Sequence, residues 1–140
     1  MPNSSNETME VLTRREVCAA TILLHGQGVA ADDLTPLLTG LTRSREIGLH
    51  FLGPNAPVRR LSINEGRPQR AWYDVPAQPE AAGARPEGLT ESVARVRELL
   101  GAERDRGIGP ERTVVGGFSQ GGAVALHVGT GWDESLAGIV

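Results

Sequence analysis

Three apolar segments along the chain have the length of buried strands. They cover residues 18–24, 47–52 and 113–115, and the last runs into two glycines. None shows the apolar/polar alternation of a strand with one face in water, so each is predicted to be a central strand covered on both sides. We therefore expect an α/β fold, with a mostly parallel sheet and helices on both faces.

Apolar residues at helical spacing separate and follow these strands. Asp32 and Asp33 precede four leucines, an acidic start that predicts a helix between the first two strands and hence a βαβ unit. The clearest predicted helix covers residues 90–106, where apolar side chains recur every three or four positions and charges lie opposite them. Residues 123–128 predict another helix, and residues 136–140 begin a further apolar strand.

The polar start of the chain predicts a flexible N-terminal tail over residues 1–16, with no secretion signal. Residues 17–140 then form one domain, and a 39% hydrophobic composition is enough to give it a core. The longest mostly apolar run, residues 17–24, is far shorter than the roughly 20 residues of a membrane helix. We expect a cytoplasmic protein without a membrane span.

Charge and cysteine content limit the partners of the protein. The net charge is −3 and all 14 basic residues are arginine, so no domain-wide positive field attracts nucleic acid or an anionic membrane. The classes of partner that this charge still allows are small neutral substrates and other proteins. The single cysteine, Cys18, permits no internal disulfide, and its apolar surroundings predict a buried thiol.

Residues 53–88 form a long segment without sustained periodicity, and it contains six of the nine prolines. Segments of this length without periodicity are usually functional or disordered. The first half, residues 54–75, carries Trp72 and Tyr73 as apolar anchors and is expected to be ordered. The second half, residues 76–86, has the composition of a linker.

Ser119 lies at the centre of a G-x-S-x-G motif between a predicted strand and a predicted helix. A nucleophilic serine there must sit on a sharp, strained turn that lifts its hydroxyl from the end of the sheet. Side chains at Gly117 or Gly121 would collide with neighbouring backbone in such a turn. The alternative is a glycine-rich turn in which the serine only caps the helix.

Two backbone amides are candidates for stabilising a developing oxyanion. The helix that begins near Gln120 directs its unpaired N–H groups toward the attacked carbonyl, so the amide of Gln120 is one candidate. The second is the amide of Gln27, in a loop after the first strand where Gly26 and Gly28 let the backbone turn tightly beside a substrate. For His25 we expect a structural role, with a ring hydrogen-bonded to fix this loop.

Four motifs in this order give the chain a family resemblance. They are ILLHGQG at 22–28, PNAP at 54–57, NEG at 64–66 with RAWYD at 70–74, and VVGGFSQGG at 114–122. The chain resembles the phospholipase/carboxylesterase family, which includes acyl-protein thioesterases.

The resemblance implies an α/β-hydrolase fold, Ser119 as the nucleophile, and the amides of Gln27 and Gln120 as oxyanion donors. It also implies that the loop around Trp72 walls the acyl site, that the substrate is a small ester or acyl thioester, and that no metal or cofactor takes part. Many thioesterase members have leucine where Gln27 stands, and residues 67–69 depart from their usual loop, so a shorter ester remains as plausible as a long acyl chain.

A serine nucleophile needs a base, which in this fold follows it in the order serine, acid, histidine. His127 comes eight residues later on a predicted helix, about 12 Å away at 1.5 Å per residue, and is out of reach. Asp133 and Glu134 lie in the connection after that helix. The resemblance implies that the acid and the histidine lie beyond residue 140. We interpret the chain as the N-terminal portion of a hydrolase, truncated after the helix that follows Ser119, without its C-terminal third and inactive alone.

One alternative remains open. In this alternative the chain is a non-catalytic hydrolase-like module whose exposed sheet edge pairs with a partner chain. The same exposed edge also predicts self-association. Dienelactone-type hydrolysis fits the turn but requires cysteine where Ser119 stands, and it is therefore discounted.

Overall fold

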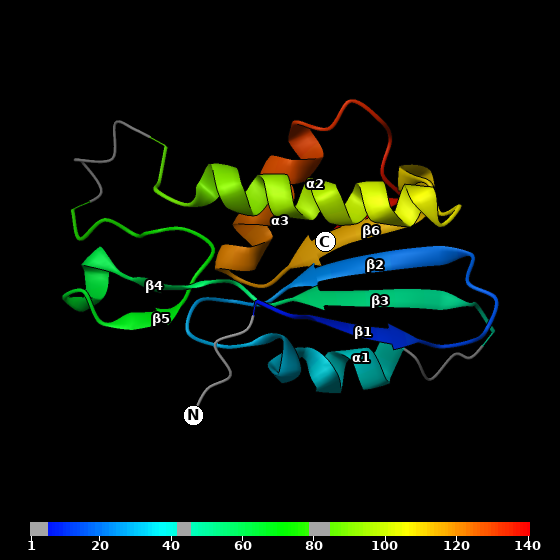
Figure 1. Cartoon of the computed structure of the whole chain (residues 1–140), viewed down its shortest axis with the longest axis horizontal. Coiled ribbons are helices and arrows are strands. Elements are labelled where there is room, and N and C mark those ends of the chain that lie inside the picture. The colour runs from blue at the N-terminus through cyan, green and yellow to red at the C-terminus, as the bar shows by residue number, and fades with distance from the viewer. Residues whose placement is uncertain (1–5, 42–45, 79–84) are drawn as a thin grey trace.

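The computed structural model describes residues 6–41, 46–78 and 85–140, which contain a central five-stranded sheet (Figure 1). In spatial order the strands are β1 (Thr8–Leu12), β3 (Leu49–Pro54), β2 (Ala19–Leu24), β6 (Thr113–Gly117) and β7 (Gly138–Ile139). Neighbouring strands are parallel except β1, which runs antiparallel to β3. The predicted mostly parallel sheet is confirmed.

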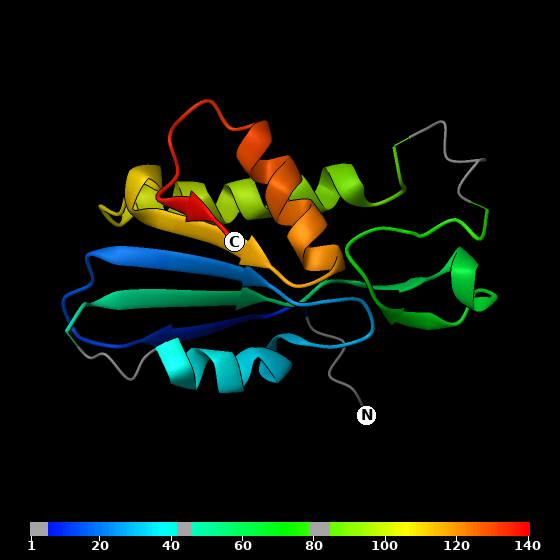
Figure 2. The same ribbon diagram turned by 180° about the vertical axis from the view of Figure 1, so that it is seen from behind.

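Helices cover both faces of this sheet, as the pattern predicted. Figures 1 and 2 show α1 (Thr35–Leu41) on one side and both α2 (Leu89–Asp105) and α3 (Gln120–Thr130) on the other. The face under α2 and α3 holds the larger apolar cluster, which joins both helices to β2, β3 and β6. The α1 face holds a smaller cluster around Phe51. Strand β2, helix α1 and strand β3 form the predicted βαβ unit.

The expectation of a flexible tail over residues 1–16 is wrong for Thr8–Leu12. This segment forms strand β1 and pairs with the edge of β3. Met9 and Val11 pack on the α1 side of the sheet, so the strand gains apolar contacts as well as hydrogen bonds. Residues 1–5 lie outside the described part of the chain.

Cys18 is exposed, so the expectation of a buried thiol is also wrong. It lies one residue before β2, where its Sγ donates a 3.4 Å hydrogen bond to the carbonyl of Gly48.

No helix among the described residues is both long and apolar enough to cross a membrane. The cytoplasmic location and the exclusion of nucleic acid remain predictions.

The first half of the long proline-rich segment is ordered, as expected. It contains a small hairpin of β4 (Val58–Arg60) and β5 (Pro68–Arg70), which projects beyond the ends of the main strands in Figure 1. The Arg59 side chain secures it by donating from Nε to the carbonyl of Ala71 at 2.9 Å. Of the second half, residues 79–84 lie outside the described part.

A buried polar cluster joins α2 to strands β3 and β1. The ring of His50, on β3, lies 2.9 Å from both carboxylate oxygens of Glu103 and 3.2 Å from Glu10 of β1. His50 and Glu103 are each about 1% exposed. Each partner at this depth requires the other, because removing one leaves the buried polar group of the other without its hydrogen bonds.

Removing the carboxylate of Glu103 should therefore destabilise the fold. We expect Glu103→Ala to lower the free energy of unfolding by about 3 to 5 kcal/mol, measured by urea denaturation. Glu98→Ala, at an exposed position of the same helix, is the control and should change it by less than about 0.5 kcal/mol. Equal losses in the two variants would contradict the assignment.

Candidate active site

Ser119 occupies a strained turn between β6 and α3. Its backbone has φ 54° and ψ −117°, and the helix begins at the next residue. A positive φ is unfavourable for a residue with a side chain, and such strain costs about 1 to 3 kcal/mol. The side chain is exposed. The predicted turn is therefore present, and it presents the hydroxyl of Ser119 to solvent.

Glycines on either side make this turn sterically possible. A Cβ added to Gly117 would lie 2.3 Å from the carbonyl carbon of Gly121. A Cβ added to Gly121 would lie 2.3 Å from the carbonyl oxygen of Leu24 and 2.6 Å from that of His25. These are main-chain atoms that cannot swing aside, so the predicted collision at both glycines is confirmed.

Sheet topology brings the loop after β2 against this turn. Strands β2 and β6 are parallel neighbours with Leu24 opposite Gly117, so the segments that follow them leave the same end of the sheet. The amide of Phe118 donates to the carbonyl of Leu24 at 3.0 Å. A Cβ added to Gly26 would lie 3.7 Å from Cβ of Ser119. The Gly26 backbone is thus in near contact with the serine.

The amides of Gln27 and Gln120 have no protein acceptor in the described part of the structure. The next amides along each segment are occupied, Gly28 by the carbonyl of Arg70 at 2.8 Å and Gly121 by that of Phe118 at 3.0 Å. Two free amides beside an exposed hydroxyl have the composition of an oxyanion hole. Their role in catalysis remains a prediction.

The ring of His25 fixes the loop, as expected. Its Nε2 accepts a 2.9 Å hydrogen bond from the amide of Ala56. Nδ1 therefore carries the proton and donates to the carbonyl of Gly26 at 2.7 Å. Burial lowers the pKa of His25, with a smaller contribution from Arg70; the hydrogen bond to Gly26 and the charge of Asp33 act in the opposite direction. A neutral ring is the form that this pair of bonds requires.

Trp72 lies wholly in the core, where its side chain is 0% exposed. Its indole N–H donates to the carbonyl of His25 at 2.8 Å, and its amide donates to Oε1 of Gln120 at 2.6 Å. The side chain of Gln120 also donates to the carbonyl of Tyr73 at 2.9 Å. The prediction that this loop walls the acyl site is untested, but the Trp72 side chain itself faces inward.

The remaining candidates for a base or acid lie away from Ser119. His127 lines a groove between α2 and α3 together with Arg97 and Trp132. Glu134, after α3, forms an ion pair with Arg104. The third histidine, His50, is in the buried cluster with Glu103. Among the described residues, no three His, Cys, Asp or Glu side chains are grouped as a metal ion would need.

Comparison with known proteins decides the relationship. The model of the phospholipase/carboxylesterase family matches residues 6–140. The chain belongs to this family. Its curated relatives include acyl-protein thioesterase 1 of Mycosarcoma maydis, 34% identical over 131 residues, and a probable carboxylesterase, SOBER1-like, of Arabidopsis thaliana, 34% identical over 128 residues. The matches cover 86% and 88% of this chain, and 55% and 48% of those proteins.

Similarity to solved structures confirms the α/β-hydrolase fold. The crystal structure of SOBER1 from Arabidopsis thaliana has a TM-score of 0.78 at 28% identity, over 88% of this chain and 60% of that one. Acyl-protein thioesterase 2 of Zea mays has a TM-score of 0.70 at 30% identity, over 90% and 52%. The chain thus spans about half the length of the family members it matches.

The close contact between Gly121 and the end of β2 predicts that alanine has opposite effects on stability at Gly121 and at Gly101. Gly121→Ala should destabilise the protein by about 1 to 3 kcal/mol or more, because the added methyl would overlap the carbonyl of Leu24. Gly101→Ala is the control within α2, where a Cβ meets nothing within 4 Å, and should stabilise by about 0.5 to 1 kcal/mol. Urea denaturation measures both, and a Gly121→Ala protein as stable as Gly101→Ala would contradict the described turn.

The neutral state of His25 predicts a loss of stability in acid. Its pKa lies below the ordinary value of 6.5, so the unfolded chain binds a proton at a pH where the folded protein does not. The stabilisation is complete above pH 6.5 and declines as the pH falls from there through the lowered pKa. Urea denaturation between pH 7.5 and pH 5 should show this decline, and it should be smaller in His25→Asn, which keeps a donor toward Gly26 but has no ionising ring. Identical pH dependence in the two proteins would contradict the prediction.

Proposed function

We propose that the chain carries the nucleophile and oxyanion hole of a serine hydrolase that cleaves carboxylic esters or thioesters. The observation that carries the proposal is the positive φ of Ser119, 54°, which presents an exposed hydroxyl at a turn from strand to helix. Backbone strain of this kind is typical of the nucleophile turn in α/β-hydrolases. The relationship to acyl-protein thioesterases and carboxylesterases supports the same chemistry.

The mechanism is acyl transfer in two steps. The hydroxyl oxygen of Ser119 attacks the carbonyl carbon of the substrate, and its proton passes to a base. The amides of Gln27 and Gln120 donate to the negative oxygen of the tetrahedral intermediate. The bond to the alcohol or thiol then breaks, and that leaving group takes a proton from the base. Water then attacks the carbonyl carbon of the acyl group and gives a proton to the base. The bond to Ser119 breaks, its oxygen takes the proton back from the base, and the carboxylic acid leaves. This chemistry requires no metal or cofactor.

The base and its acid partner are proposed to lie outside these 140 residues. None of the three histidines is available, because His25 and His50 are buried with both ring nitrogens engaged and His127 is about 12 Å along α3. The chain spans about half the length of its family relatives, which is consistent with this division. We therefore expect the chain alone to acylate slowly, through its oxyanion hole without base catalysis.

The alternative proposal is a non-catalytic module that pairs with a partner chain or with itself. Strand β7 pairs with β6 on one side, and no described residue pairs with its other side. Ile139 and Val140 are 38% and 74% exposed. An apolar edge of this kind is a template for strand addition.

A fluorophosphonate probe tests the nucleophile directly. The phosphonyl group should attach to Ser119 slowly in buffer and faster as imidazole is added, since free imidazole replaces the absent base. Intact-mass measurement gives the rate, and peptide mapping gives the position. Ser119→Ala should abolish the adduct, while Ser135→Ala, which removes another exposed serine, should leave it unchanged.

The outcomes separate the two proposals. No adduct at any imidazole concentration would contradict a catalytic Ser119 and favour the pairing module. Rapid stoichiometric labelling without imidazole would show that a base is already present, and the module would then be excluded.

A further inference from the structure

A continuous path of buried hydrogen bonds connects the residues whose amides are proposed to hold the oxyanion. It runs from Gly26 to the ring of His25, from the carbonyl of His25 to the indole of Trp72, and from the amide of Trp72 to the side chain of Gln120. The three bonds measure 2.7, 2.8 and 2.6 Å. His25 and Trp72 are both 0% exposed and Gln120 is 7% exposed, so water does not compete for these bonds.

The first bond controls the direction of the amide of Gln27. The carbonyl of Gly26 and the N–H of Gln27 belong to one planar trans peptide and point in opposite directions. When the His25 ring holds that carbonyl at 2.7 Å, the N–H is fixed on the opposite side of the plane. The amide of Gln120 is fixed in the same way, because the carbonyl of Ser119 accepts a 3.2 Å bond from the amide of Ala123.

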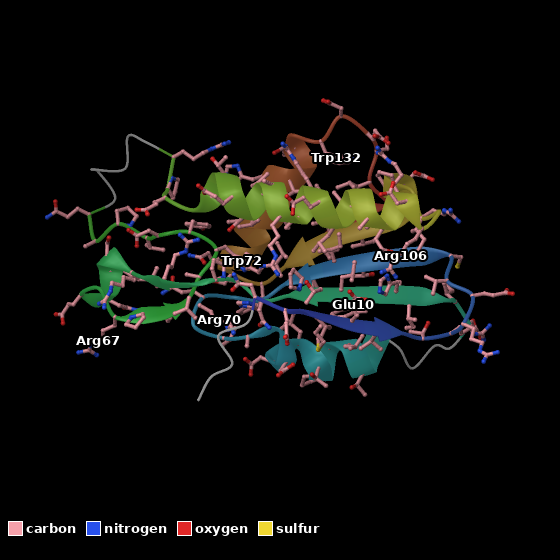
Figure 3. All side chains as sticks on the ribbon, in the orientation of Figure 1. Glu10, Arg67, Arg70, Trp72, Arg106 and Trp132 are labelled. Carbon is pink, nitrogen blue, oxygen red and sulfur yellow. The ribbon has the colours of Figure 1, made fainter. Side chains whose placement is uncertain are left out.

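Trp72 links the part of this path that leads to His25 with the part that leads to Gln120. Figure 3 shows it between α2 and the ends of the strands, and its ring lies 5.1 Å from that of His25 at a tilt of 37°. The carbonyl of Trp72 is also held, by Oγ of Ser92 at 2.5 Å. Every polar group of Trp72 therefore has a partner, and its contacts run toward the two donor residues and toward α2.

We propose that Trp72 is a positioning residue of the oxyanion hole, which holds the amides of Gln27 and Gln120 at a fixed spacing through His25 and Gln120. The proposal rests on the proposed function, and it gives Trp72 a role that requires no contact with substrate. An oxyanion hole is effective only when its donors are already oriented before the reaction. Loosening their spacing should slow acyl transfer without altering the nucleophile.

The test uses a Ser119→Cys background, because a thiol ionises without an added base. Two rate constants are measured for the introduced thiol. In acylation by p-nitrophenyl acetate, sulfur attacks the carbonyl carbon, the thiol proton goes to solvent, and p-nitrophenolate leaves with the electrons of the broken C–O bond. In alkylation by iodoacetamide, sulfur displaces iodide and no oxyanion forms. The ratio of the two rates therefore reports the oxyanion hole alone.

Trp72→Phe in this background replaces the indole with a phenyl ring, so the side chain stays aromatic but loses the N–H that holds the carbonyl of His25. We expect acylation to fall about tenfold or more, within the 10²- to 10³-fold cost of losing one donor outright, while alkylation stays within about twofold. Trp132→Phe is the matched control, because the indole N–H of Trp132 is buried without a hydrogen-bond partner and lies away from Trp72 in Figure 3. Both of its rates should be unchanged.

An unchanged ratio in Trp72→Phe would overturn the proposal. If circular dichroism shows that this variant does not fold, Gln120→Met breaks the same path at its other end with similar side-chain volume, and the ratio must fall there instead.

Cys18 supplies an internal reference, because it is an exposed thiol at the opposite end of the sheet from Ser119. Its own ratio of acylation to alkylation can be read by peptide mapping. A ratio at position 119 no higher than at Cys18 would mean that no oxyanion hole exists. The proposed function would then fail, and the role of Trp72 with it. A high ratio that is insensitive to Trp72→Phe would remove only the role of Trp72.

Discussion

The positive φ of Ser119 is the constraint on which the rest of the site depends. A φ of 54° is unfavourable for serine, so the surrounding structure must hold it in place. Hydrogen bonds from Phe118 to Leu24 and from Ala123 to Ser119 restrain the chain on either side of the turn. The glycine at 121 then allows α3 to start in direct contact with the carbonyls of Leu24 and His25. The strain is thus supported by main-chain contacts that side-chain changes do not readily alter.

The order of the strands explains why two distant segments form one site. Residues 25–28 and 118–121 are far apart in sequence, but β2 and β6 are adjacent and parallel, and both segments follow the same end of the sheet. Helices α2 and α3 pack over this pair through one apolar cluster that includes Trp72. Trp72 therefore belongs both to the apolar core and to the hydrogen-bond path proposed to orient the two amides. A change in core packing around Trp72 should consequently alter the positions of those amides.

Much of this arrangement is predictable from the sequence, because local patterns encode it. Apolar runs identify β2, β3 and β6, and the glycines around Ser119 identify the turn. Contacts between distant residues leave no comparable pattern. Thr8–Leu12 is short and half polar, and only the exposed edge of β3 makes it a strand. The bond between His50 and Glu103 spans 53 positions, and nothing near either residue indicates it. The inward side chain of Gln120 is unpredictable for the same reason.

The small hairpin of β4 and β5 reaches the loop of Gln27 through main-chain atoms. The amide of Gly28 donates to the carbonyl of Arg70 at 2.8 Å, a bond that any residue at position 70 can accept. Exposed side chains on the hairpin, among them Val58, Arg60 and Arg67, make no part of that bond. Substitutions of these side chains therefore leave the main-chain bond between Gly28 and Arg70 in place. The surface chemistry of the hairpin and its main-chain support for the loop of Gln27 are thus separable properties of the same segment.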